Sequence, residues 1–218
     1  MQCQGYPGGS KPGHQATAQR QDPCRPEYFL TARIGLFGGS FDPFHVGHFL
    51  VARTAKEKFS LSEVVFLPCA RSPLKRLPPA ASDRFRLGLL RAGLRGQSWA
   101  RVSDWEIRQG GVSYTVETMR AWKSRFPRAS LFWIMGSDQW ELLSGWRNPR
   151  ELAGNLEFLV FPRPHRPQGR RFFRMREIPL RLDISSTEIR RRLKKGMSVR
   201  GMVLAPVETM LQRHRPYR

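Results

Sequence analysis

Residues 34–48, IGLFGGSFDPFHVGH, hold the pattern that decides the fold. The run 34–37 has the length and the apolar composition of a buried strand, and Gly38-Gly39 ends it. Good helix formers without a proline follow over residues 46–59. A strand that passes through such a loop into a helix is typical of the first unit of a parallel α/β sheet.

Strand and helix signals continue to alternate beyond this stretch. Apolar or β-rich runs predict strands at residues 64–67, 101–107, 130–135, 157–161 and 178–182. Capping residues and helix formers predict helices that begin near Ser82, Thr115, Asn148, Ser185 and Pro206. This alternation predicts a Rossmann-like, doubly wound parallel sheet with helices on both faces, in a single α/β domain.

Two segments do not fit the alternation. Residues 1–30 are rich in Gly, Pro and Gln and contain few groups that could pack against a core, so we expect a disordered N-terminal extension before a folded domain at 31–218. Residues 162–176 contain three prolines and six arginines, and we expect them to form an exposed loop.

The chain is strongly basic. Its 38 Lys and Arg outnumber its 17 Asp and Glu, which gives a formal charge of +21, and the segment from Arg163 to Arg218 has 16 basic and four acidic residues. Such an excess attracts phosphates without saying which ones. A solvated basic face, an acidic small-molecule substrate and nucleic-acid contact are all compatible with this charge.

Composition excludes several other classes of protein. No segment approaches the roughly 18 apolar residues of a membrane span, and the first thirty residues lack the apolar run of a secretory signal. Cys3, Cys24 and Cys69 have neither CxxC spacing nor histidine partners at metal-ligand spacing, so we expect no disulfide framework and no metal site. These absences favour a cytoplasmic location and no membrane partner.

The loop after the first predicted strand has the features of a phosphate site. In doubly wound sheets, ligands bind beyond the carboxyl ends of the strands, and Gly38 and Gly39 let the backbone approach a nucleotide there. His45 and His48 are three residues apart at a helix start, so both rings lie on one face and can reach phosphate oxygens. Gly47 leaves the space between them open.

A second anion site is predicted at residues 183–190, DISSTEIR. Ser185 and Glu188 have the spacing of a capping box, so a helix begins here with exposed N–H groups. Hydroxyls and the Arg190 guanidinium converge on the same helix start. The chain contains neither a GxGxxG dinucleotide fingerprint nor a GxxxxGK[ST] P-loop, which argues against dehydrogenases and P-loop kinases.

With these two motifs, the chain resembles the nucleotidyltransferase superfamily with HxGH and [ST]xxR signatures, and within it the bacterial nicotinate-nucleotide adenylyltransferases of NAD biosynthesis. The resemblance runs from about Arg33 to the C-terminus. GGSFDPFHVGH, Ser113-Tyr114-Thr115, the 136–138 stretch with Trp146, and DISSTEIR carry it. His45 and the residues at 184–187 favour the nicotinate branch.

The resemblance implies roles for individual residues. ATP would lie against Gly38, Gly39, Ser40, Phe41, His45, His48, Gly136, Asp138, Ile184, Ser186, Thr187 and Arg190. Nicotinate mononucleotide would contact Lys75, Ser113, Tyr114, Thr115 and Trp146, with the indole stacked on its ring. His45, His48, Lys75 and Arg190 are the expected catalytic residues, and Asp138 is expected to hold the ribose.

The reaction that this resemblance implies is transfer of AMP from ATP to nicotinate mononucleotide, which gives nicotinate adenine dinucleotide and pyrophosphate. We expect Mg²⁺ to arrive with ATP, because it prefers phosphate oxygens and water to a protein cage. Three alternatives stay open: transfer of AMP or CMP to another phosphorylated acceptor, a non-catalytic nucleotide sensor, and a basic nucleic-acid-binding protein. We expect nucleic acid not to be a partner, and the sequence does not determine the oligomeric state.

Overall fold

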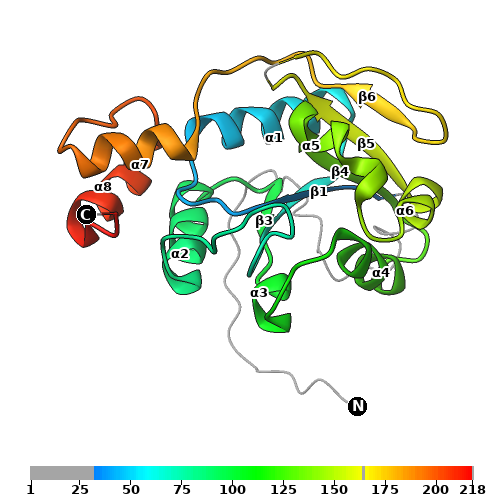
Figure 1. Ribbon diagram of the computed structural model, residues 1–218, viewed down its shortest axis with the longest axis horizontal. Helices are drawn as coiled ribbons and strands as arrows, with labels where there is room; N and C mark the ends of the chain where they lie inside the picture. Colours follow the sequence, from blue (N-terminus) through cyan, green and yellow to red (C-terminus); the bar gives the residue numbers. More distant parts are fainter. Residues whose placement is uncertain (1–31, 164, 218) are drawn as a thin grey trace, which may run out of the picture.

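A computed structural model describes residues 32–163 and 165–217; the predicted extension at 1–30 lies outside the described residues. Six parallel strands form one sheet in the order β3-β2-β1-β4-β5-β6 (Figure 1). Their bounds are β1 Arg33–Gly39, β2 Glu63–Pro68, β3 Ala100–Val102, β4 Ser130–Gly136, β5 Leu156–Phe161 and β6 Met175–Glu177. The predicted doubly wound parallel sheet in a single domain is confirmed.

Helices lie between successive strands from β1 to β5, and two more follow β6. They are α1 Val46–Lys58, α2 Asp83–Gly93, α3 Trp105–Gln109, α4 Thr115–Arg125, α5 Ser137–Glu141, α6 Pro149–Asn155, α7 Ser186–Lys194 and α8 Ala205–His214, with a 3₁₀ turn, η2, at Leu143–Gly145. Figure 1 shows α1 on one face of the sheet and α3 and α4 on the other. Helices on both faces explain why the central strands are apolar on every side.

The strands divide their side chains between two cores, as the two-residue period requires. In β4, Phe132 and Ile134 pack in the core that contains α1, α2, α7 and α8, whereas Leu131, Trp133 and Met135 pack in the core that contains α4, α5 and α6. The sheet is therefore a buried layer between two apolar clusters.

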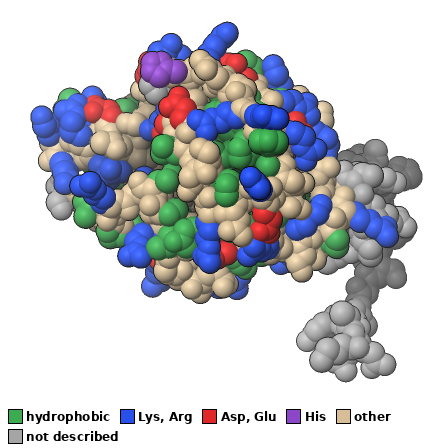
Figure 2. All heavy atoms as spheres, turned by 45° about the vertical axis from the view of Figure 1, so that its right-hand side comes forward, with side chains coloured by type: hydrophobic (Ala, Val, Ile, Leu, Met, Phe, Trp, Pro, Cys, Tyr) green, Lys and Arg blue, Asp and Glu red, His purple; other side chains and the backbone are tan. Residues whose placement is uncertain are grey.

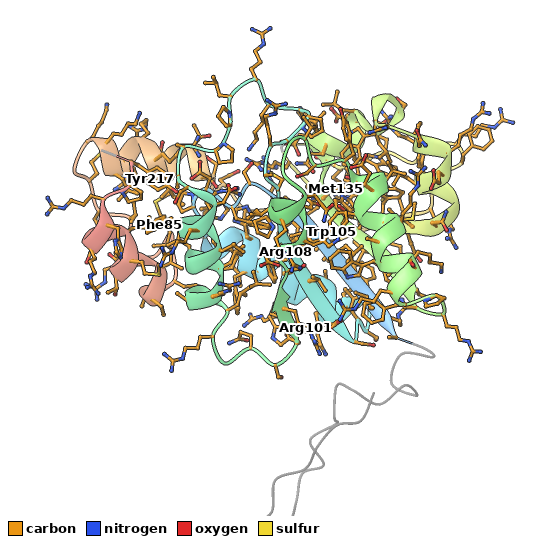
Figure 3. The ribbon with its side chains drawn as sticks, turned by 90° about the horizontal axis from the view of Figure 1, so that it is seen from below. Phe85, Arg101, Trp105, Arg108, Met135 and Tyr217 are labelled. Carbon is orange, nitrogen blue, oxygen red and sulfur yellow. The ribbon has the colours of Figure 1, made fainter. Side chains whose placement is uncertain are left out.

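The predicted strand at 101–107 is wrong in its second half. Only Ala100–Val102 pairs, with β2, and the chain then turns at Ser103-Asp104 into helix α3. Ser103 Oγ accepts the backbone N–H of Trp105 at 3.3 Å, a local bond that ends a strand readily. Figure 3 shows Arg101 on the strand and Trp105 and Arg108 on α3.

The last strand also lies elsewhere than predicted. Residues 175–177, which overlap the end of the loop expected at 162–176, form β6 beside β5, and 178–182 do not form a strand. Ile178 makes one further backbone bond, to the carbonyl of Val160 at 2.8 Å. Pro179 follows and has no N–H to continue the ladder.

The sheet order places a crevice beside β1. Successive connections run from β1 toward β3 on one side and then return to β4 on the other, so the chain reverses direction across the sheet at β1 and β4. Loops at the carboxyl ends of these strands diverge there and leave room for a ligand. Both predicted motifs border this crevice.

Candidate active site

Two histidines close the first turn of α1. The N-cap residue His45 accepts the backbone N–H of His48 at its Nδ1, and the His48 Nδ1 accepts the backbone N–H of His45, both at 3.4 Å. The rings stack with centroids 3.6 Å apart. Because each Nδ1 is an acceptor, each neutral ring has its hydrogen on Nε2, where it is free to donate to a ligand.

The histidines are neutral at physiological pH in the absence of a ligand. Burial, assisted by the positive charge of Arg163, lowers the pKa of His45 to about 3. Burial also lowers the pKa of His48, with smaller effects from His45, Arg163 and Lys75. The site therefore offers two N–H donors among cationic side chains, an arrangement suited to an anion of high charge.

Two glycines are required by close approach at the site. A Cβ on Gly47 would lie 3.0 Å from the His45 ring, and one on Gly136 would collide with Asp138 Oδ1. Larger residues at these positions would displace the side chains that we expect to contact ATP.

The second motif begins α7 and binds the first motif directly. Ser185 caps the helix by accepting the N–H of Glu188 at 3.2 Å, as predicted. Ser186 Oγ donates to the carbonyl of Pro43 at 3.0 Å, and Arg190 donates to the carbonyl of Asp42 at 2.6 Å. Segments more than 140 residues apart in sequence thus form one wall.

The residues predicted to surround ATP line one cavity of about 630 Å³. It includes all twelve: Gly38, Gly39, Ser40, Phe41, His45, His48, Gly136, Asp138, Ile184, Ser186, Thr187 and Arg190. Lys75 also lines it, and its Nζ donates to Ser40 Oγ at 3.0 Å.

A second cavity, of about 220 Å³, adjoins the first. It contains all five residues predicted to contact the acceptor: Lys75, Ser113, Tyr114, Thr115 and Trp146. Gly38, Gly39, Ser40 and Lys75 line both cavities, so a ligand in each would meet at this loop. The indole N–H of Trp146 is buried and has no protein partner among the described residues, which leaves a donor for a ligand.

Sequence reasoning missed Arg86, whose hydrogen bonds hold the loop that follows β1. Its side chain is completely buried and donates to the carbonyls of Ser40 and Cys69, each at 2.7 Å, and to Asp83 at 2.6 Å. Its place in α2 gave no signal, because an arginine three residues after an aspartate is common on exposed helix faces.

Arg163 and Glu106 also went unpredicted. Arg163 follows β5 and lines the larger cavity, where its charge acts on both histidines. Glu106 lines the smaller cavity and accepts the hydroxyl of Thr118 at 2.6 Å; its burial raises the pKa of its carboxyl. A position just after a strand was the available signal for Arg163.

No helix within 32–163 or 165–217 is long and apolar enough to cross a membrane. Nor do these ranges contain a group of three or more His, Cys, Asp or Glu side chains placed to hold a metal ion.

The chain is similar to known nucleotidyltransferases in both sequence and fold. The cytidylyltransferase-like family model matches residues 36–192. The probable nicotinate-nucleotide adenylyltransferases of Rhodopirellula baltica and Thermus thermophilus are 36% and 39% identical to the chain, each over 85% of it and over 93% and 100% of their own lengths. The nicotinic acid mononucleotide adenylyltransferase of Plasmodium falciparum, solved with NaAD, has the same fold, with a TM-score of 0.72 at 19% identity over 85% of this chain and 97% of that one. The predicted resemblance is thus confirmed, and the chain belongs to the nicotinate-nucleotide adenylyltransferase family.

Proposed function

We propose that this chain transfers AMP from ATP to nicotinate mononucleotide, giving nicotinate adenine dinucleotide and pyrophosphate. The observation that supports this most directly is the pair of cavities that meet at Gly38–Ser40 and Lys75. A reaction that joins two nucleotides needs two adjacent sites with a cationic group where they meet. Family membership supplies the nature of the two substrates.

The acceptor's phosphate oxygen attacks the α-phosphorus of ATP, and the bond from that phosphorus to the bridging oxygen of pyrophosphate breaks. The electron pair leaves with pyrophosphate, so no covalent enzyme intermediate is needed. Because the protein takes no covalent part, catalysis comes from alignment and from donors that face the developing charge.

Four side chains are proposed to supply that stabilisation. Nε2–H of His45 and of His48 donate to triphosphate oxygens, and Arg190 lies across the same cavity at the start of α7. Lys75 lines both cavities, and we assign it to the phosphates of both substrates. Asp138, after β4, is assigned to the ribose of ATP.

Ser113, Tyr114 and Thr115 lead into α4 and are proposed to meet the nicotinate carboxylate. Backbone N–H groups and the Thr115 hydroxyl suit a carboxylate, whereas an amide would direct its NH₂ at one of these donors. Trp146 is proposed to stack on the pyridine ring, which the acid and the amide share, so the indole does not discriminate between them.

Mg²⁺ is proposed to enter as the complex with ATP. The polar side chains that line the ATP cavity are mostly hydroxyls, imidazoles and cations, and the Asp42 carboxylate already accepts three hydrogen bonds from protein groups. This donor set fits phosphates rather than a bare divalent cation, which prefers phosphate oxygens and water. When bound, Mg²⁺ would neutralise charge on the triphosphate.

The arginine-rich segment, residues 162–176, makes contacts with the rest of the domain that favour a structural role. Arg170 donates to the carbonyl of Glu141 at 2.6 Å, Arg176 pairs with Glu157, and Arg166 lies 3.7 Å from Glu177. Figure 2 shows Lys and Arg side chains spread over the visible face rather than gathered in one stripe. That nucleic acid is not a partner stays a prediction.

The test is dinucleotide formation by the purified chain with ATP, Mg²⁺ and a panel of acceptors, followed by chromatography and by pyrophosphate release. We expect nicotinate mononucleotide to exceed its amide counterpart about ten-fold or more in kcat/KM, equivalent to about 1.4 kcal/mol. Measurement at two salt concentrations separates a general preference of the basic surface for acidic ligands from the preference set by contacts. Equal values for the two acceptors would contradict the nicotinate assignment and leave adenylyl transfer standing.

A further inference from the structure

Tyr217, near the end of the chain, contacts Asp42 in the loop between β1 and α1. Helix α8 ends at His214, and Arg215 has a left-handed backbone with φ of 45°, which turns the chain back toward the domain. Tyr217 is only 3% exposed, and its hydroxyl donates to Asp42 Oδ1 at 2.7 Å, across 175 residues of sequence. Figure 3 shows Tyr217 on the same side of the molecule as Phe85 of α2.

The Asp42 carboxylate is buried and is held by uncharged donors. Besides the tyrosine, it accepts the backbone N–H of Ala80 at 2.7 Å and that of Ala81 at 3.2 Å. None of the ion pairs among the described residues involves this carboxylate. A buried carboxylate depends on each donor it has, so loss of the tyrosine hydroxyl removes one of only three.

These bonds fix the wall of the ATP cavity on two sides. Residues 75–80 line the cavity; Lys75 anchors one end of this segment on Ser40, and the Asp42 carboxylate anchors the other end through Ala80 and Ala81. Asp42 itself lies three residues before His45, and its carbonyl accepts the bond from Arg190. A shift of Asp42 would therefore move both residues 75–80, the Lys75 segment, and the residues that lead from Asp42 to His45, the His45 loop.

We propose that Tyr217 is a positioning residue for adenylyl transfer, whose hydroxyl orients the Asp42 carboxylate and through it the Lys75 segment and the His45 loop. Tyr217 lines neither nucleotide cavity, so it acts through Asp42. Burial and the neighbouring Asp42 carboxylate raise the pKa of Tyr217, so its hydroxyl keeps its proton and remains a donor. The inference rests on the proposed function, because the groups it positions are those assigned to the phosphates.

The ring and the hydroxyl of Tyr217 have separable roles. The ring belongs to the apolar core that also holds Val207 and Leu211 of α8. Tyr217→Phe keeps the ring and removes only the donor. Val207→Ala is the matched control: Val207 is fully buried in the same core and its apolar side chain offers Asp42 no hydrogen bond, so its truncation destabilises the domain without removing the tyrosine donor.

Steady-state kinetics with ATP and nicotinate mononucleotide, well below the melting temperature of each variant, make the test. We expect Tyr217→Phe to lower kcat about ten-fold with KM for the acceptor changed less than about two-fold, since misplaced donors act mainly in the transition state. Val207→Ala should lower the melting temperature and keep kcat within about two-fold. A Tyr217→Phe enzyme with near-normal kcat, or equal losses of kcat in the two variants, would overturn the proposal.

Hydrogen exchange gives a readout that does not depend on the reaction. The amides of Ala80 and Ala81 donate to Asp42, so they should exchange faster in Tyr217→Phe and not in Val207→Ala, when both are compared with the unaltered chain. An unaltered chain that forms no dinucleotide would refute the proposed function; exchange at these two amides would then decide the positioning role by itself. Unchanged exchange in Tyr217→Phe would overturn it.

Discussion

His45 has two separable functions in the structure, and two substitutions should distinguish them. It caps α1 by accepting the N–H of His48, and it presents Nε2–H to the ATP cavity. His45→Ala removes both functions. His45→Asn keeps an oxygen that can accept the capping bond, because Asn is among the best N-cap residues, but its short side chain does not reach as far as Nε2.

The two losses differ in magnitude. Loss of an N-cap acceptor costs about 1 kcal/mol of folding free energy, so His45→Ala should melt several degrees lower and His45→Asn close to the unaltered chain. Loss of one preorganised donor to developing charge costs roughly 3 kcal/mol in the transition state. Both variants should therefore lose at least about 100-fold in kcat.

The assay is pyrophosphate release at saturating ATP and nicotinate mononucleotide, with thermal melting and ATP affinity measured on the same preparations. We expect ATP affinity to change less than kcat, because the donor acts mostly on charge that develops during transfer. A His45→Asn enzyme with near-normal kcat would refute the assignment of Nε2–H as a donor. A His45→Ala enzyme whose kcat recovers fully on cooling would show that only capping was lost.

Two further predictions concern stability and acceptor binding. Because the pKa of His45 is lowered to about 3 in the folded chain, the unfolded chain binds more protons below pH 6.5, so the folded chain should lose stability as the pH decreases. Between pH 7 and pH 4.5 the loss of folding free energy from His45 is about 2 to 3 kcal/mol, and His45→Asn should reduce this dependence on pH in denaturant titrations. Trp146→Ala should raise KM for nicotinate mononucleotide about ten-fold and leave KM for ATP within about two-fold, because the indole lines only the smaller cavity; equal changes in both values would argue against its stacking role.

Most of the fold could be predicted because its strands are buried on both faces. Strands such as β1 and β4 then appear in the sequence as short apolar runs, which the 34–37 and 130–135 patterns captured. The strand β6, Met-Arg-Glu, has no such run. It is a strand because the free edge of β5 offers backbone partners, which is a tertiary effect that local composition does not contain.

The candidate site also contains residues that local sequence predicts and residues that it does not. Glycines, histidines and a capped helix start are local signals, and Gly38, Gly39, His45, His48 and Arg190, to which they pointed, line the larger cavity. Arg86, Asp42 and Tyr217 matter through bonds to backbone or side chains far along the chain, and nothing in their neighbouring sequence indicates those partners. Spacing within a motif predicts which groups face the cavity, whereas the groups that support the motif depend on the packed fold.

The histidine capping box stabilises the start of α1 and also fixes which ring nitrogens carry hydrogen, which a Ser and Glu box would not do. In a Ser and Glu box, the capping side chains end at the helix and offer a ligand no further donor. With imidazoles, the same two bonds that cap α1 occupy each Nδ1 and so fix the hydrogen on Nε2, facing the cavity. Protonation at Nδ1 would break a cap, so the fold itself opposes the charged ring while the site is empty. The N–H donors that we propose for catalysis are therefore set in place before ATP binds, and no proton has to be gained to create them.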